Sequence, residues 1–145
     1  MNYSELVDIL AEKELKVTPQ RLAVLEALTM LKTHPTVEDI KEFVRKKNPN
    51  LALGTVYNIL DTFYEKRIVT KVKTDKDFVR YDMDMHKHHH IYCEECDSIE
   101  NYYDDELDQL LQGYFKKKRI PNFEIKEINL QITGNYIEHK PTKTN

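Results

Sequence analysis

Several residue types that mark common classes of protein are scarce or missing in this chain. Its 145 residues include two cysteines, three glycines and no tryptophan. Two cysteines cannot build a disulfide framework, and the scattered glycines form neither a phosphate-binding loop nor a nucleophile elbow. The sequence therefore indicates neither a disulfide-stapled secreted domain nor a P-loop nucleotide-binding protein. No internal repeat is present either.

Long apolar runs are also missing. No uninterrupted apolar stretch is long enough to span a bilayer, and the first fifteen residues carry four acidic side chains where a secretory signal would be basic and then apolar. We therefore expect a cytoplasmic protein that does not enter a membrane. In a reducing cytosol, a Cys-x-x-Cys pair such as Cys93 and Cys96 is typical of metal binding or redox activity.

Charge is unevenly distributed along the chain, although the net charge is only −3. Residues 1–82 contain 14 Lys and Arg against 13 Asp and Glu, whereas residues 83–145 contain 8 against 12. The pattern changes at the same point, from helical periodicity to short alternating runs. We predict two domains, residues 1–82 and residues 83–145.

The first domain has the pattern of a winged helix-turn-helix. Helix-start signals and apolar stripes predict helices over residues 4–14, 19–32, 36–48 and 53–66, and residues 68–73 and 78–81 read as a β-hairpin. The apolar stripe of the fourth helix leaves Thr55, Tyr57 and Asn58 pointing elsewhere near its N-terminus. Such side chains suit base edges and phosphates better than a core.

The second domain is predicted to be a small α/β lobe. We expect strands over residues 88–93 and 98–103, an amphipathic helix over residues 104–118 and a final strand within residues 123–132. A three-stranded sheet with one helix cannot cover both of its faces, so we expect the lobe to pair with a second copy. The predicted fold class is α+β, with an N-terminal winged helix-turn-helix followed by a small α/β dimerisation lobe.

Residues 86–96 concentrate metal-binding side chains. Four of the six histidines and both cysteines fall within this stretch. Imidazole and thiolate bind borderline metals well, and neither fills a core as well as Leu or Ile. The cluster therefore predicts a metal site. The competing interpretations are a solvated strand for the histidines and a reduced, partly buried pair for the cysteines.

Several motifs, in this order and spacing, resemble those of the ferric uptake regulator family. They are Thr18-Pro19-Gln20-Arg21, His34-Pro35-Thr36, Gly54-Thr55-Val56-Tyr57-Asn58, the histidine cluster, and Cys93-x-x-Cys96. The likeness runs from about Leu6 to Gly134. It implies a homodimeric, metal-dependent transcriptional repressor that binds a palindromic operator in double-stranded DNA. The C-terminal lobe would both dimerise and house metal.

The resemblance places a regulatory metal on His34, Asp82, His88 and His90. Alternate residues of one strand point to one side, so His88 and His90 can share an ion while His89 faces away. Three imidazoles and a carboxylate suit Fe²⁺, Mn²⁺ or Zn²⁺, and this ligand set does not indicate which of the three is bound. The family's fifth ligand, normally acidic, falls on Asn101, with Glu100 one position early.

The identity of residue 82 distinguishes branches of the family. Peroxide-sensing members have Asp where iron-sensing members usually have Glu, so Asp82 resembles the peroxide-sensing branch. In that branch bound Fe²⁺ reacts with peroxide and oxidises a ligating histidine, here equivalent to His34 or His88. The resemblance thus favours Fe²⁺ or Mn²⁺ at the regulatory site and iron-dependent peroxide sensing.

Two further family metal sites are altered in this chain. The structural zinc normally uses two CxxC pairs, and the second pair aligns with Tyr136 and His139. Zn²⁺ is therefore either absent or held by Cys93, Cys96 and His139 with another ligand. The third family site aligns with Lys87, which is no ligand, and with His89, Asp108 and Glu127.

The resemblance also assigns residues to DNA. Thr55, Tyr57 and Asn58 would enter the major groove, Arg21 would contact phosphate, and Lys16 would lie near the minor groove.

Other functions remain as alternatives. The same ligands would suit an iron, manganese or zinc uptake regulator without peroxide chemistry. A metallohydrolase is more distant, because two histidines and an aspartate can hold a catalytic zinc, but no general base is identifiable and an enzyme would not need a recognition helix. A structural zinc module using Cys93 and Cys96 alone is a third reading. We expect that the protein is not an enzyme.

Overall fold

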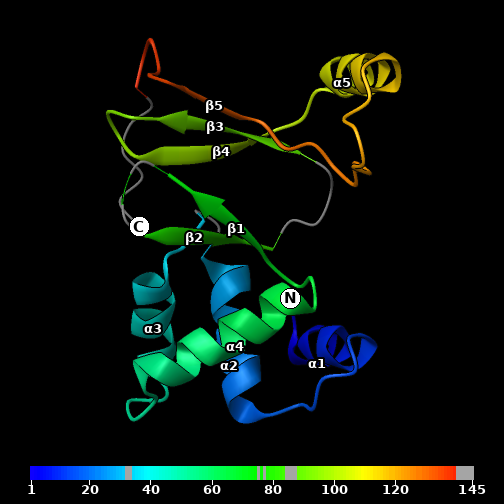
Figure 1. Cartoon of the computed structure of the whole chain (residues 1–145). Coiled ribbons are helices and arrows are strands. Elements are labelled where there is room, and N and C mark those ends of the chain that lie inside the picture. The colour runs from blue at the N-terminus through cyan, green and yellow to red at the C-terminus, as the bar shows by residue number, and fades with distance from the viewer. Residues whose placement is uncertain (32–33, 75, 77, 84–87, 140–145) are drawn as a thin grey trace. The chain divides into compact units, whose positions relative to one another are not determined.

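The computed structural model describes residues 1–31, 34–74, 76, 78–83 and 88–139. The chain divides into two compact units, Met1–Met85 and His86–Asn145, and each is treated below by itself. Helices and small sheets occur together, which confirms the predicted α+β class (Figure 1). Within the described ranges, no helix combines the length and apolar character needed to cross a membrane.

The N-terminal unit contains four helices and a hairpin. The helices are α1 (Tyr3–Glu12), α2 (Pro19–Met30), α3 (Val37–Arg45) and α4 (Leu53–Glu65), and the antiparallel strands are β1 (Thr70–Lys73) and β2 (Val79–Asp82). This order confirms the helices and hairpin of the predicted winged helix-turn-helix.

Local capping interactions explain where these helices begin. Thr18 accepts the backbone N–H of Arg21 at the start of α2, and Thr36 and Asp39 form a capping box at α3. The first helix starts earlier than predicted, because Asn2 rather than Ser4 caps it, accepting the N–H of Glu5 at 2.9 Å.

A single apolar core holds the N-terminal unit together. All four helices and β2 contribute buried side chains to it, as do Ile68 and Val69 just before β1. The largest of its fully enclosed side chains include Leu10, Leu25, Ile40, Leu60 and Phe63. Burial of each such side chain contributes about 1.5–3 kcal/mol. The core fixes the orientation of α4, whose buried stripe is Val56, Ile59, Leu60 and Phe63. In the first turns of α4, the side opposite this buried stripe faces solvent.

The C-terminal unit is a three-stranded sheet with one helix. Its elements are β3 (His89–Cys93), β4 (Ser98–Tyr102), α5 (Asp105–Lys117) and β5 (Gln131–Gly134), in the sheet order β4-β3-β5 (Figure 1). β3 pairs antiparallel with β4 and parallel with β5.

The last strand differs from the prediction. It begins at Gln131 and ends at Gly134, beyond most of the predicted range of residues 123–132. The reason is the length of its partner, because β3 has only five residues and pairs with β5 from His90 to Cys93. The alternation of apolar residues before Gln131 therefore finds no strand to pair with.

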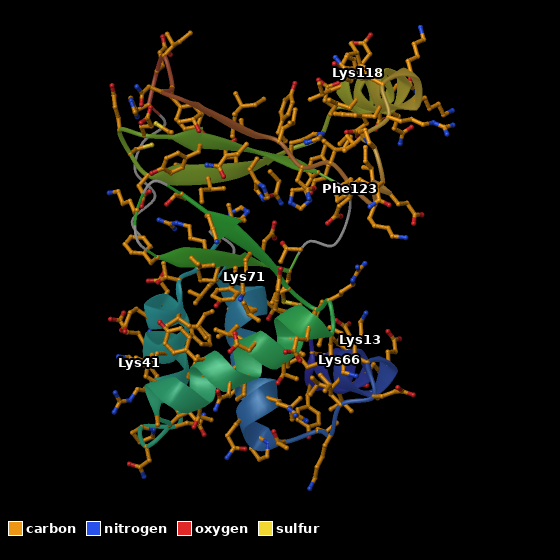
Figure 2. All side chains as sticks on the ribbon, viewed as in Figure 1. Lys13, Lys41, Lys66, Lys71, Lys118 and Phe123 are labelled. Carbon is orange, nitrogen blue, oxygen red and sulfur yellow. The ribbon has the colours of Figure 1, made fainter. Side chains whose placement is uncertain are left out.

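Much of the apolar surface of the C-terminal unit is uncovered. α5 buries none of its residues, although it is amphipathic. Phe123 lies on the segment that follows α5 (Figure 2). It is 65% exposed. A folded domain gains free energy by covering such surface, which supports the expected pairing with a second copy.

Candidate metal centres and DNA-binding helix

His34 and Asp82 are brought together by strand register in the N-terminal unit. Thr36 forms an antiparallel bridge with Arg80, and the N–H of Tyr81 donates to the carbonyl of Pro35 at 2.9 Å. Continuing this register by two residues places His34 opposite Asp82. Both side chains are buried, and His34 Nε2 lies 3.4 Å from Asp82 Oδ2.

The backbone at His34 is strained. Its φ is 56°, in the left-handed region that residues other than glycine seldom adopt, and such a conformation costs on the order of 1–3 kcal/mol. The surrounding contacts hold it, since the Arg80 guanidinium donates to the His34 carbonyl at 3.2 Å. Strain of this kind is frequent where a side chain must be aimed for function.

His88 and His90 form a second pair, in the C-terminal unit. Their Nε2 atoms are 3.2 Å apart and their rings meet edge to face, with centroids separated by 4.7 Å. The ring of Tyr103 lies against His88, at 5.5 Å between centroids. The predicted alternation, with both rings on one side of the strand, is confirmed.

Both pairs have the spacing of ligands to a single ion. Two bonds of about 2.1 Å at a tetrahedral angle place the ligand atoms about 3.4 Å apart. The separations of 3.4 Å in the His34–Asp82 pair and 3.2 Å in the His88–His90 pair agree with that value. Imidazole nitrogen and carboxylate oxygen are the donors that Fe²⁺, Mn²⁺ and Zn²⁺ accept, so the residues present fit such an ion.

His89 faces the other side of β3, as predicted, and is completely buried. Its Nδ1 accepts the backbone N–H of Leu130 at 3.0 Å, which leaves the proton on Nε2 to be donated to Asp108 Oδ1 at 2.7 Å. Glu127 is exposed, and among the described residues no metal-ligand cluster of three contains His89. The ring thus joins β3, α5 and the segment before β5 through hydrogen bonds.

The register of β3 and β4 separates the two candidates for a fifth regulatory ligand. Asn101 is opposite His90, whereas Glu100 is opposite Ile91. Paired residues share a face of the sheet, so Asn101 lies on the face of His90 and Glu100 on the other. The pKa of Tyr136 is raised first by burial and then by the nearby carboxylate of Glu100.

Cys93, Cys96 and His139 form a third candidate centre. One ligand atom from each lies within 4.8 Å of the other two, although His139 is more than forty residues from the cysteines in sequence. Asn135 connects the two segments, because its side-chain oxygen accepts the N–H of Glu95 at 3.0 Å and lies 3.9 Å from Cys93 Sγ.

The sulfur of Cys93 is surrounded by donors. Burial by itself would raise the pKa of the Cys93 thiol, but hydrogen bonds from the Cys96 thiol and from the backbone N–H groups of Tyr136, Cys96 and Glu95 lower it overall. Donation of its own proton raises the pKa of Cys96. A thiolate is the form of cysteine that binds metal, so this arrangement fits a zinc ion.

The first turns of α4 present the residues predicted to read DNA. Tyr57 is 45% exposed, Asn58 is exposed and Thr55 is half-buried. At the start of α2, the Arg21 guanidinium donates to the carbonyl of Lys16 at 2.8 Å. The N-terminal unit thus carries an aromatic side chain, two small polar side chains and two basic side chains. This set is chemically suitable for contacts with base edges and phosphates.

Sequence reasoning missed two residues of the cysteine centre, Glu95 and Asn135. Glu95 bonds a ring nitrogen of His139 at 2.7 Å. The position of Glu95 between the two cysteines could have indicated a role at this centre. No sequence feature indicated a role for Asn135, because that role depends on how β5 pairs with β3.

Comparison with known proteins agrees with the motifs. The profile of the ferric uptake regulator family matches residues 12–133. The peroxide operon regulator of Bacillus subtilis is 32% identical over 130 residues, which cover 90% of this chain and 88% of that protein.

Solved structures show the same fold. The ferric uptake regulator of Pseudomonas aeruginosa with manganese matches with a TM-score of 0.76 and 21% identity, covering 92% of this chain and 98% of that chain. The Helicobacter pylori ferric uptake regulator, which has three functional metal binding sites, matches with a TM-score of 0.72 and 24% identity, covering 90% of this chain and 87% of that chain.

Proposed function

Because the chain belongs to the ferric uptake regulator family, we propose that it is a metal-dependent transcriptional repressor rather than an enzyme. It binds a palindromic operator in double-stranded DNA as a homodimer in the cytoplasm. Its contacts with DNA are Thr55, Tyr57 and Asn58 in the major groove, Arg21 on phosphate and Lys16 near the minor groove. The uncovered apolar surface of α5 and of the segment after it supports the dimer.

The regulatory ion takes His34 and Asp82 from the first unit and His88 and His90 from the second. The observation that supports this proposal is the spacing within each pair, 3.4 Å between His34 and Asp82 and 3.2 Å between His88 and His90, which suits two ligands to one ion. Asn101 is the candidate for a further ligand, ahead of Glu100. An ion that needs ligands from both units restricts their arrangement, so metal binding biases the spacing of the two recognition helices in the dimer.

The proposed signal is peroxide, with Fe²⁺ as the responsive ion and Mn²⁺ as an unreactive substitute. Bound Fe²⁺ would supply the reaction with peroxide that adds oxygen to a neighbouring imidazole, His34 or His88. Asp82 and the similarity to the peroxide operon regulator of Bacillus subtilis support this choice. A modified imidazole is a poorer ligand, so the pair that held the ion no longer favours the DNA-binding arrangement.

Two accessory metal sites complete the proposal. Zn²⁺ at Cys93, Cys96 and His139 would tie the segment after β5 to the turn between β3 and β4. The secondary site at His89, Asp108 and Glu127 has less support, because both nitrogens of His89 already have hydrogen-bond partners.

Metal-dependent DNA binding tests the regulatory site. We expect the protein loaded anaerobically with Mn²⁺ to bind a labelled palindromic duplex, with binding that weakens as salt rises because phosphate contacts release counterions. His88→Ala should remove the metal dependence. His86→Ala, which removes a histidine two positions earlier in the sequence that has no role in the proposal, should leave the metal dependence unchanged. Binding that is indifferent to metal and to His88→Ala would overturn the proposal.

Peroxide sensing needs a separate measurement. After addition of peroxide to the Fe²⁺ form, we expect release of DNA together with a mass increase of one oxygen atom on His34 or His88, and neither change in the Mn²⁺ form. Release without histidine oxidation would instead favour an iron, manganese or zinc uptake regulator that responds to metal loss.

A further inference from the structure

The turn that carries the two cysteines is hydrogen-bonded to the residues after β5. The N–H of Glu94 donates to the carbonyl of Gly134 at 2.9 Å, and the N–H of Glu95 donates to Asn135 Oδ1 at 3.0 Å. These bonds extend the pairing of β3 with β5 past the ends of both strands. They bring His139 beside the cysteines, where its ring is a candidate for a third metal ligand.

Glu95 stands between the cysteines in sequence and contacts the histidine in space. Its Oε2 lies 2.7 Å from His139 Nε2, while its carboxylate is outside the group of mutually close ligand atoms formed by Cys93, Cys96 and His139. A carboxylate that accepts the proton of one ring nitrogen leaves the lone pair of the other nitrogen available for a metal. Ligating histidines are commonly fixed in this way.

We propose that Glu95 is the positioning residue of the zinc site: it binds His139 Nε2–H and so presents His139 Nδ1 to the ion held by Cys93 and Cys96. The inference rests on the proposed zinc site and adds a residue that the family resemblance does not supply. It accounts for how a chain with a single CxxC pair can hold His139 in place as a third ligand.

The exposure of the histidine explains why such a residue is needed. His139 is about two-fifths exposed and the Glu95 side chain is more exposed still. Tyr136 contacts the histidine edge to face, at 6.2 Å between ring centroids, which leaves much of its surface unrestrained. A ligand that must be immobilised on binding lowers the affinity for the ion, and a partner that orients it beforehand reduces this loss.

The test uses cobalt as a spectroscopic substitute for zinc in the full-length protein. The chain has only two cysteines, so a thiolate-to-cobalt charge-transfer band reports this centre and not the histidine sites. Competition of zinc against bound cobalt then yields the zinc affinity. Glu95→Ala should weaken zinc binding by about 10–100-fold. The charge-transfer band should remain, while the ligand-field bands change as they do in His139→Ala.

Two matched variants separate positioning from charge. Glu94→Ala removes the same charge one residue away and should leave affinity and spectrum unchanged. Glu95→Gln keeps an oxygen that accepts the histidine proton and should restore most of the affinity. If Glu95→Ala unfolds the turn, Glu95→Gln carries the test, because near-normal affinity with an unchanged ligand field is expected for it.

The outcomes distinguish the positioning role of Glu95 from the role of His139 as a ligand. Wild-type zinc affinity in Glu95→Ala overturns the positioning role. If His139→Ala also has wild-type zinc affinity, His139 is not a ligand. If, in addition, zinc binding is lost only in Cys93→Ser, the cysteines are the whole site. None of these results bears on metal-dependent DNA binding, which depends on His34, Asp82, His88 and His90.

Discussion

Replacement of His89 by leucine should destabilise the C-terminal unit through two lost hydrogen bonds. Leucine is apolar and of comparable size, so it keeps the site filled and removes only the ring nitrogens. The N–H of Leu130 then loses its acceptor, and Asp108 loses the proton that it accepts from a fully buried ring.

The magnitude follows from how well water can replace each partner. An amide N–H left without an acceptor inside a protein costs about 1–3 kcal/mol. Asp108 is 19% exposed and can turn part of its carboxylate to solvent, so its contribution lies at the lower end of that range. We expect a total loss of about 2–4 kcal/mol. Asp108→Asn retains an oxygen acceptor for His89 and should cost less.

Two measurements check this expectation. Urea unfolding followed by circular dichroism gives the loss of stability. Amide hydrogen exchange identifies its location, because the Leu130 amide should lose protection in the variant beyond what the global loss of stability explains. Both measurements are made with chelator and again with zinc, because a metal that binds only the folded wild type would stabilise it by an amount that rises with the ratio of free metal to Kd.

Metal dependence would refute the reasoning. If wild-type protein in chelator is as unstable as His89→Leu, and only added metal separates them, then a metal ion at His89, Asp108 and Glu127 holds this region. An unchanged exchange rate at Leu130 in the variant would equally show that its N–H does not depend on His89.

Two further predictions concern DNA recognition and the response to acid. Tyr57→Ala should weaken specific binding by about 1–3 kcal/mol, measured by fluorescence anisotropy at fixed salt, while Tyr64→Ala, at 47% exposure on the last turn of the same helix, should not; equal effects would contradict major-groove contact by the start of α4. Asp104 caps α5, and bonds from the N–H of Leu107 and then from the hydroxyl of Tyr102 hold its pKa below the usual value. Its contribution is therefore complete above the unfolded pKa of about 4 and is lost as pH falls through the lower folded pKa. Asp104→Asn keeps the cap without the charge, so its unfolding midpoint should vary less with pH in that window; an identical acid profile would contradict the assignment.

The helices and their boundaries were largely predictable because their signals are local. Thr18 and Thr36 bond backbone groups three residues away, and the buried stripe of α4 repeats with the helical period. The alternation that separates His88 and His90 from His89 is local as well, and its consequence was correct. Features that depend only on residue type and on short spacing in the sequence could thus be predicted without a structure.

Tertiary structure decided which distant side chains meet. His34 faces Asp82 because the bridge at Thr36 and Arg80 sets a register, and no property of residue 34 specifies its partner. His139 reaches Cys93 because β5 pairs in parallel with β3, and Glu95 acquires its partner by the same pairing. Such contacts depend on strand register and on where a segment ends, and the last strand begins at Gln131 because its pairing with β3 begins there, opposite His90. Residue types and short-range spacing therefore identify the metal donors, whereas pairing between remote segments determines which of them form a centre.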